Sequence, residues 1–163
     1  MSDSSAKSEL KISTAQYDPA AVDVISALFR EYAESMEQDT CFASLHQELE
    51  NLPGQYFEPD GLLLIATVND EPAGCIGFQK LETGRCEMVR LWVRPEFRSQ
   101  KVGIKLIEAL MNRARLAGYK SMLLRTLPHR MQKAVSLYHS LGFKQIPNRP
   151  GSPEQVLTME IAL

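Results

Sequence analysis

The polar segment from Arg98 to Ile104 holds the residues whose types and spacing point most directly to chemistry. It joins an apolar strand that ends near Val93 to the start of a long amphipathic helix. The first backbone amides of a helix have no partner inside it and lie at the positive end of the helix dipole, so they bind anions, phosphate above all. Arg98 and Lys101 add positive charge there. The same residues are also typical of an ordinary strand-to-helix turn with surface cations, and both interpretations stay open at this point.

Glu87 is the second candidate, because it is a carboxylate inside a predicted strand. Period-two alternation puts it on the face that also holds Val89, Leu91 and Val93. Trp92 falls on the opposite face and is expected to pack. A carboxylate on an apolar face is costly unless it is paired or protonated, so a raised pKa is expected, which suits a general base near neutral pH. A glutamate in solvent or paired with a lysine is the alternative, and a β-bulge would reverse the alternation.

A mixed sheet is predicted to hold these residues. Short turns with Asn, Asp or Gly join the second, third and fourth strands, which therefore form antiparallel hairpins. The fourth and fifth strands flank a helix, and such a crossover makes a parallel pair. The strands are expected at Leu10–Thr14, Leu62–Val68, Ala73–Leu81, Arg85–Val93, Ser121–Thr126 and Val156–Leu163.

Start and stop signals define four helices between these strands. Asp18 supplies an N-cap and Pro19 occupies the first helical position. Ser44 begins a capping box for a second helix. Two amphipathic helices are expected at Val102–Ala117 and Met131–Leu141, each followed by glycine. The predicted order is therefore β-α-α-β-β-β-α-β-α-β.

Length and composition narrow the class of protein. The chain has 163 residues, which suits one domain over 10–163 after a disordered tail at 1–9. Its net charge of −2 argues against a nucleic-acid binder that relies on a large basic surface, and leaves a local basic pocket for a phosphorylated ligand open. Three cysteines without regular spacing predict reduced thiols and no metal site. The polar N-terminus does not resemble a signal peptide, and the longest apolar run, Leu62–Val68, is too short to span a bilayer. A cytoplasmic protein without a membrane partner is expected.

Two motifs together resemble the GNAT (GCN5-related N-acetyltransferase) superfamily. Arg98-Ser99-Gln100-Lys101-Val102-Gly103 is similar to its acyl-CoA signature, Arg/Gln-x-x-Gly-x-Gly/Ala, which follows a strand of the type L-x-V-x-P. The segment from Ala134 to Phe143 is similar to its second motif, A-x-x-L-Y-x-x-L-G-F. The resemblance covers residues 10–163. It implies a GNAT fold of class α/β (α+β), with six to seven strands in a mixed sheet and about four helices.

The resemblance also implies acetyl-CoA as the acyl donor, bound mainly by the main chain. The pyrophosphate is expected on the signature turn, which comprises Arg98, Ser99, Gln100, Lys101, Val102, Gly103 and Ile104. The pantetheine arm is expected along Leu91, Trp92 and Val93. Lys101 departs from the signature, which has glycine there. In a left-handed conformation lysine costs roughly 1 kcal/mol, and its ammonium group is a candidate partner for a phosphate.

Tyr138 and Glu87 are the expected catalytic residues for transfer of an acetyl group to a primary amine. In the family, the tyrosine of the second motif directs its hydroxyl at the CoA sulfur and donates a proton to it. Glu87, counted back from Arg98, falls where some family members carry their catalytic glutamate. Three histidines lack a partner motif and are weaker candidates: His46, His129 and His139.

The family's acceptor enters opposite CoA, here between Phe29–Tyr56 and Pro147–Gln155. The expected partner is a small-molecule or peptide amine, and the protein is expected to be a monomer or homodimer. Acidic side chains in the first segment suit a cationic amine, although a solvated helix face explains them as well: Glu31, Glu34, Glu37 and Asp39. Two alternatives stay open, a non-catalytic acyl-CoA-binding protein of the same fold and a nucleotide-binding protein.

Overall fold

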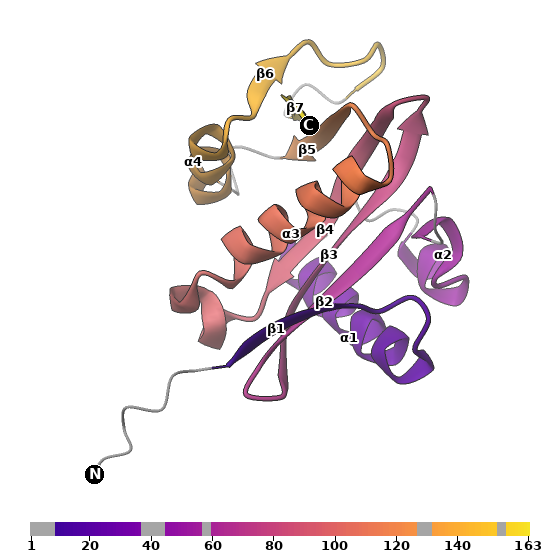
Figure 1. Ribbon diagram of the computed structural model, residues 1–163, viewed down its shortest axis with the longest axis vertical. Coiled ribbons are helices and arrows are strands. Elements are labelled where there is room, and N and C mark those ends of the chain that lie inside the picture. The colour runs from indigo at the N-terminus through magenta and orange to yellow at the C-terminus, as the bar shows by residue number, and fades with distance from the viewer. Residues whose placement is uncertain (1–8, 37–44, 57–59, 127–131, 153–155) are drawn as a thin grey trace.

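A seven-stranded mixed sheet forms the centre of the molecule (Figure 1). The computed structural model describes residues 9–36, 45–56, 60–126, 132–152 and 156–163. The strand order is β1-β2-β3-β4-β5-β7-β6, and all neighbours are antiparallel except β4 and β5. The strands are β1 (Leu10–Thr14), β2 (Leu62–Val68), β3 (Glu71–Glu82), β4 (Arg85–Val93), β5 (Ser121–Thr126), β6 (Lys144–Ile146) and β7 (Leu157–Ala162). The predicted fold class is confirmed, and β6 is the strand that was not predicted, because three residues are too few to show alternation.

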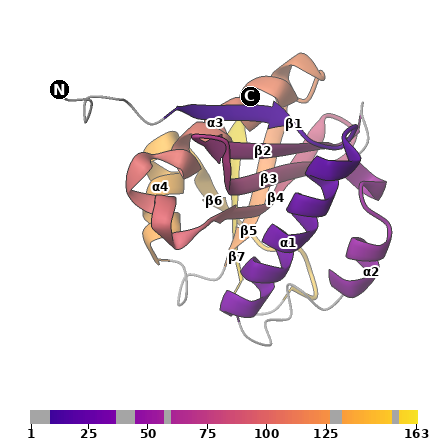
Figure 2. The ribbon, with the colours of Figure 1, turned by 90° about the horizontal axis from the view of Figure 1, so that it is seen from below.

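Helices cover both faces of this sheet. The described α-helices are α1 (Pro19–Met36), α2 (Leu45–Glu50), α3 (Val102–Leu116) and α4 (Gln132–Leu141), with short 3-10 helices η3 (Gly54–Tyr56) and η4 (Pro95–Gln100). Figures 1 and 2 show α3 on one face and α1 with α2 on the other. The predicted tail at 1–9 falls outside the described residues except for Glu9 and stays a prediction.

Local signals fix the helix ends as the sequence predicts. The Asp18 side chain accepts a hydrogen bond of 3.1 Å from the amide of Ala20. Gly118 and Gly142 follow α3 and α4 with φ of 94° and 106°, angles that L side chains rarely adopt. The predicted capping serine, Ser44, lies outside the described residues.

Two apolar clusters hold the helices on the sheet. Beneath α3, the fully buried Leu106, Ile107 and Leu110 pack on inward residues of the sheet, and Tyr138 of α4 joins the same cluster. Beneath α1, a smaller cluster gathers around Phe29. The two faces of the sheet therefore have separate cores.

A β-bulge in β4 changes which face its side chains occupy. Gly77 of β3 pairs with Val89, and Cys75 pairs with Trp92. Between these two pairs β4 contains one residue more than β3, and there Arg90 takes a φ of 58°.

The bulge overturns the predicted alternation around Glu87. Val89 and Trp92 both pack in the cluster beneath α1, whereas Leu91 and Val93 pack beneath α3. Glu87 is two residues before Val89 on a regular stretch, so it shares that face. The prediction that Glu87 lies with Leu91 and Val93, and opposite Trp92, was therefore wrong beyond Val89, because the extra residue reverses the pattern.

Candidate active site at the fork between two strands

β4 and β5 part at Glu87. Their parallel pairing covers only three positions, and Glu87 opposite Leu123 is the last of them. Beyond this point β4 stays paired with β3 as far as Val93, and β5 stays paired with β7 as far as Thr126. No strand among the described residues pairs with the diverging edge of β4. The main chain of Leu91, Trp92 and Val93 therefore borders a fork in the sheet.

The signature turn presents unpartnered amides at the start of α3. Lys101 follows η4 and has left-handed angles, with φ of 60° and ψ of 25°. The first helical hydrogen bond runs from the amide of Lys105 to the Lys101 carbonyl, at 3.2 Å. Among the described residues, the amides of Val102, Gly103 and Ile104 donate to none, and no side chain caps the helix. The conformation that favours glycine in the signature is thus kept here by lysine.

Trp92 and Arg98 connect this turn to α1. The Arg98 guanidinium lies 4.9 Å from the centre of the Trp92 ring, and its Nε donates to the Val93 carbonyl at 2.9 Å. Trp92 Nε1 donates to Glu31 at 3.2 Å. Arg94 binds the same carboxylate with two nitrogens, at 3.0 and 2.7 Å. Arg98, Trp92 and Arg94 thus link the turn and the end of β4 to Glu31 on α1.

This cluster changes the interpretation of the acidic residues on α1. The Arg94 guanidinium holds the pKa of the Glu31 carboxyl below its ordinary value. Glu31 therefore keeps its negative charge, but Arg94 balances it. Glu37 and Asp39 lie outside the described residues. Two of the four acidic residues expected to attract a cationic amine are therefore described. Glu31 is ion-paired, whereas Glu34 is exposed and has no ion pair among the described residues.

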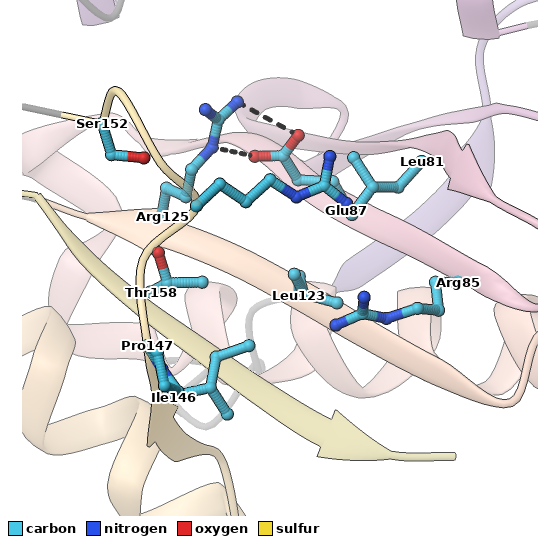
Figure 3. A pocket seen from close by; sticks show the side chains of 10 residues that line it. Leu81, Arg85, Glu87, Leu123, Arg125, Ile146, Pro147, Ser152 and Thr158 are labelled. Carbon is cyan, nitrogen blue, oxygen red and sulfur yellow. Dashed lines mark hydrogen bonds and ion pairs between the residues drawn. The ribbon is translucent and has the colours of Figure 1, made fainter.

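Glu87 is buried and ion-paired. It is 4% exposed, and Arg125 of β5 binds both carboxylate oxygens, at 2.7 Å to Oε2 and 3.3 Å to Oε1 (Figure 3). Gln79 of β3 donates to Oε1 at 3.3 Å. The partner is an arginine, where the sequence suggested a lysine as one alternative. The pair borders a cavity of about 220 Å³.

A chain of hydrogen bonds extends from Glu87 toward α2. Gln79 accepts from the amide nitrogen of Gln55 at 3.1 Å, and that nitrogen also lies 3.3 Å from Glu48. Glu48 binds Arg90 at 3.0 and 3.2 Å, so the chain ends at the bulge. Sequence reasoning missed these partners because their side chains are far apart along the chain.

Tyr138 lies on the other face of the sheet. It is 6% exposed, and its ring packs edge-on against Phe143 with 5.9 Å between ring centres. Burial raises the pKa of its hydroxyl to about 12, which keeps the hydroxyl protonated at neutral pH. Within the described ranges this hydroxyl makes no hydrogen bond. Tyr138 and Glu87 are not in contact, because they lie on opposite faces of the sheet. The fork is the part of the sheet where β4 and β5 are no longer hydrogen-bonded to each other.

Of the three histidines, the structure describes the side chain of His139. His139 is exposed, whereas His129 and the side chain of His46 lie outside the described residues. In the described parts of the chain no group of three His, Cys, Asp or Glu residues is arranged to hold a metal. None of the helices there is both long and apolar enough to cross a membrane.

Comparisons with known proteins point to one family. The model of the acetyltransferase (GNAT) family matches residues 23–143. An uncharacterized N-acetyltransferase of Schizosaccharomyces pombe is 37% identical over 128 residues, which cover 77% of this chain and 78% of that protein.

Solved structures show the same fold. A GNAT-family acetyltransferase from Staphylococcus aureus Mu50 has a TM-score of 0.76 at 17% identity, covering 94% of this chain and 99% of that one. The PaiA N-acetyltransferase of Thermoplasma acidophilum, solved in complex with coenzyme A, has a TM-score of 0.73 at 16% identity, covering 95% and 99%. The family match extends over most of the chain, and it includes both the Arg98 turn and the Tyr138 motif. The chain therefore belongs to the GNAT acetyltransferase family.

Proposed function

We propose that this protein transfers the acetyl group of acetyl-CoA to a primary amine by direct attack within a ternary complex. The observation that carries the proposal is the fork between β4 and β5, which opens beyond Glu87, in a chain that also has unpartnered amides at the start of α3 and a buried Tyr138 hydroxyl. Acetyl-CoA supplies an activated thioester. All other contributions come from side chains and main-chain groups of this chain.

The binding part of the proposal rests on backbone groups. The amides of Val102, Gly103 and Ile104 stand at the positive end of α3, which suits a pyrophosphate. The edge of β4 from Leu91 to Val93 offers main-chain groups to an amide-containing arm. Solved relatives bound to coenzyme A or acetyl-CoA support this assignment.

The catalytic part of the proposal assigns one residue to the proton that the leaving sulfur gains and one to the proton that the attacking amine loses. Tyr138 protonates the leaving sulfur, which its raised pKa of about 12 allows because the hydroxyl stays protonated at neutral pH. Glu87 accepts a proton from the attacking amine. For this the amine must reach the carboxylate that Arg125 binds, so binding of the acceptor and rearrangement of this ion pair go together.

Thermal unfolding with acetyl-CoA, CoA, ATP and NAD tests the binding part. A ligand at 100 times its dissociation constant adds about 2.7 kcal/mol, which raises the midpoint of a domain this size by about 5–10 °C. We expect that rise with the two CoA species alone. Thiol release from acetyl-CoA in the presence of primary amines then tests transfer. Stabilisation without thiol release for any amine would support the non-catalytic acyl-CoA-binding alternative, and no stabilisation would contradict both.

A further inference from the structure

The cavity beside Glu87 is small and lined by arginines. Its volume is about 220 Å³, which is less than the roughly 300–1,000 Å³ of pockets for drug-sized ligands. Among the described residues, its charged lining consists of Arg85, Arg125 and Arg149 together with the carboxylate of Glu87. Leu123 contributes an apolar wall (Figure 3). A pocket of this kind suits a small ligand with a negatively charged group.

Arg149 is placed to exchange its partner for such a ligand. Its guanidinium pairs with Glu82 at 2.8 Å, but Arg85 binds the same oxygen of Glu82 at 2.9 Å. The Arg149 side chain is 57% exposed, and exposed ion pairs are weak. Arg85 keeps a second carboxylate, Glu160, at 2.9 Å. If Arg149 left Glu82, Glu82 would therefore stay paired with Arg85, and Arg85 would stay paired with Glu160.

The backbone next to Arg149 is held in place while its side chain is exposed. The side-chain nitrogen of Asn148 donates to the carbonyl of Val156 at 2.7 Å, and its side-chain oxygen accepts from the Thr158 hydroxyl at 2.6 Å. These bonds tie the residue before Arg149 to the region of β7. The backbone next to Arg149 is thus anchored beside β7 through Asn148.

The Glu87–Arg125 pair is itself complementary to a molecule that carries both charges. An ammonium group can take the place of Arg125 at Glu87, and a carboxylate can take the place of Glu87 at Arg125. The first exchange keeps a cation beside the buried carboxylate of Glu87, so that this carboxylate stays paired.

We propose that the acetyl acceptor is a small primary amine that also carries a carboxylate, with the carboxylate at Arg125 and Arg149 and the nitrogen at Glu87. This inference rests on the proposed acetyl transfer. The nitrogen–carbon bond forms as the carbon–sulfur bond breaks. Two protons leave the ammonium nitrogen, one through Glu87 to solvent and one that restores the Tyr138 hydroxyl after it protonates the sulfur.

The test measures thiol release with matched acceptors. The panel contains the standard amino acids, β-alanine and 4-aminobutyrate, together with the carboxamide and the decarboxylated amine of each. We expect kcat/KM to be at least tenfold higher for the carboxylate form than for its two analogues, as for loss of a charged hydrogen bond. Arg149→Gln should raise KM for the carboxylate form about tenfold and leave its analogues unchanged. Arg115→Gln, an exposed residue of α3, is the matched control and should change nothing.

Each contrary result has a separate meaning. If the carboxamide or the decarboxylated amine reacts as well as the acid, or if Arg149→Gln leaves their ratio unchanged, the acceptor assignment is overturned and acetyl transfer stands. If only amines without a carboxylate react, the assignment is likewise overturned. If acetyl-CoA does not stabilise the protein, or no amine in the panel promotes thiol release, both proposals fail.

Discussion

The two faces of the sheet differ most where β4 and β5 part. On the α3 face the side chains are apolar, and Tyr138 brings the hydroxyl that faces no described partner. On the α1 and α2 face a chain of polar side chains runs from Arg90 through Glu48, Gln55 and Gln79 to Glu87. The proposed cofactor site on the first face uses backbone groups, so many apolar side chains would serve there. The second face depends on particular side chains, and substitutions on it should alter the choice of acceptor and the shape of the bulge.

Removal of Glu48 should have the largest effect, and it tests whether the polar chain stabilises the α1 and α2 face. Its side chain is 9% exposed and that of its partner Arg90 is 11% exposed, and removal of one member of a buried ion pair costs about 3–5 kcal/mol. Glu48→Ala should therefore lower the free energy of unfolding by about that amount, measured by urea denaturation. Glu108→Ala is the control, because its pair with Lys105 spans 4.0 Å on the surface and should change stability by less than about 0.5 kcal/mol. Equal effects in the two variants would mean that the polar chain does not support this face.

Tyr138→Phe tests the opposite face through activity. Loss of a general acid should lower kcat by about 100-fold, whereas the stabilisation by acetyl-CoA should persist because binding rests on the main chain. His139→Gln, which changes the exposed neighbour, should leave both quantities unchanged. An unchanged kcat in Tyr138→Phe would assign Tyr138 to packing alone.

The same residue predicts a pH dependence of stability. Burial raises the pKa of Tyr138 to about 12, above the usual value near 10, so the unfolded chain ionises first as pH rises. The stability due to the neutral hydroxyl is complete below pH 10 and is lost between about pH 10 and 12. The free energy of unfolding, measured in urea, should fall between pH 9 and pH 11.5 in both proteins. This fall should be smaller by about 1–2 kcal/mol in Tyr138→Phe than in the unchanged protein. Tyr119, whose pKa burial also raises to about 12, is present in both proteins and cancels. Equal losses would show that Tyr138 is not sheltered from water.

The difference between the faces also explains what the sequence could predict. The bounds of β1, β2, β4 and β5 match the prediction residue for residue, because alternation and turn residues are local signals. The bulge has no such local signal, because the residue with positive φ is Arg90 and not a glycine. The pair of Glu87 with Arg125 joins residues 38 apart, and that of Glu31 with Arg94 joins residues 63 apart. Such partners follow from the folded sheet and have no periodicity in the sequence. The α3 face was therefore predictable, and the polar face was not.

Substitutions of Lys101 should have the smallest effect on stability. They distinguish the cost of its backbone conformation from the contribution of its ammonium group. Its left-handed φ of 60° costs roughly 1–2 kcal/mol in a residue with a side chain, and glycine removes that cost while adding some entropy to the unfolded chain. Lys101→Gly should therefore raise the free energy of unfolding by up to about 1 kcal/mol, measured by urea denaturation. Lys101→Ala keeps the backbone cost and removes only the ammonium group, so it should not stabilise the protein. If the ammonium group pairs with a phosphate of acetyl-CoA, both variants should bind acetyl-CoA more weakly by a similar factor in calorimetry. Weaker binding in Lys101→Ala alone would mean that the glycine compensates by letting the backbone approach the pyrophosphate, and equal stability of the two variants would contradict the strain assigned to this turn.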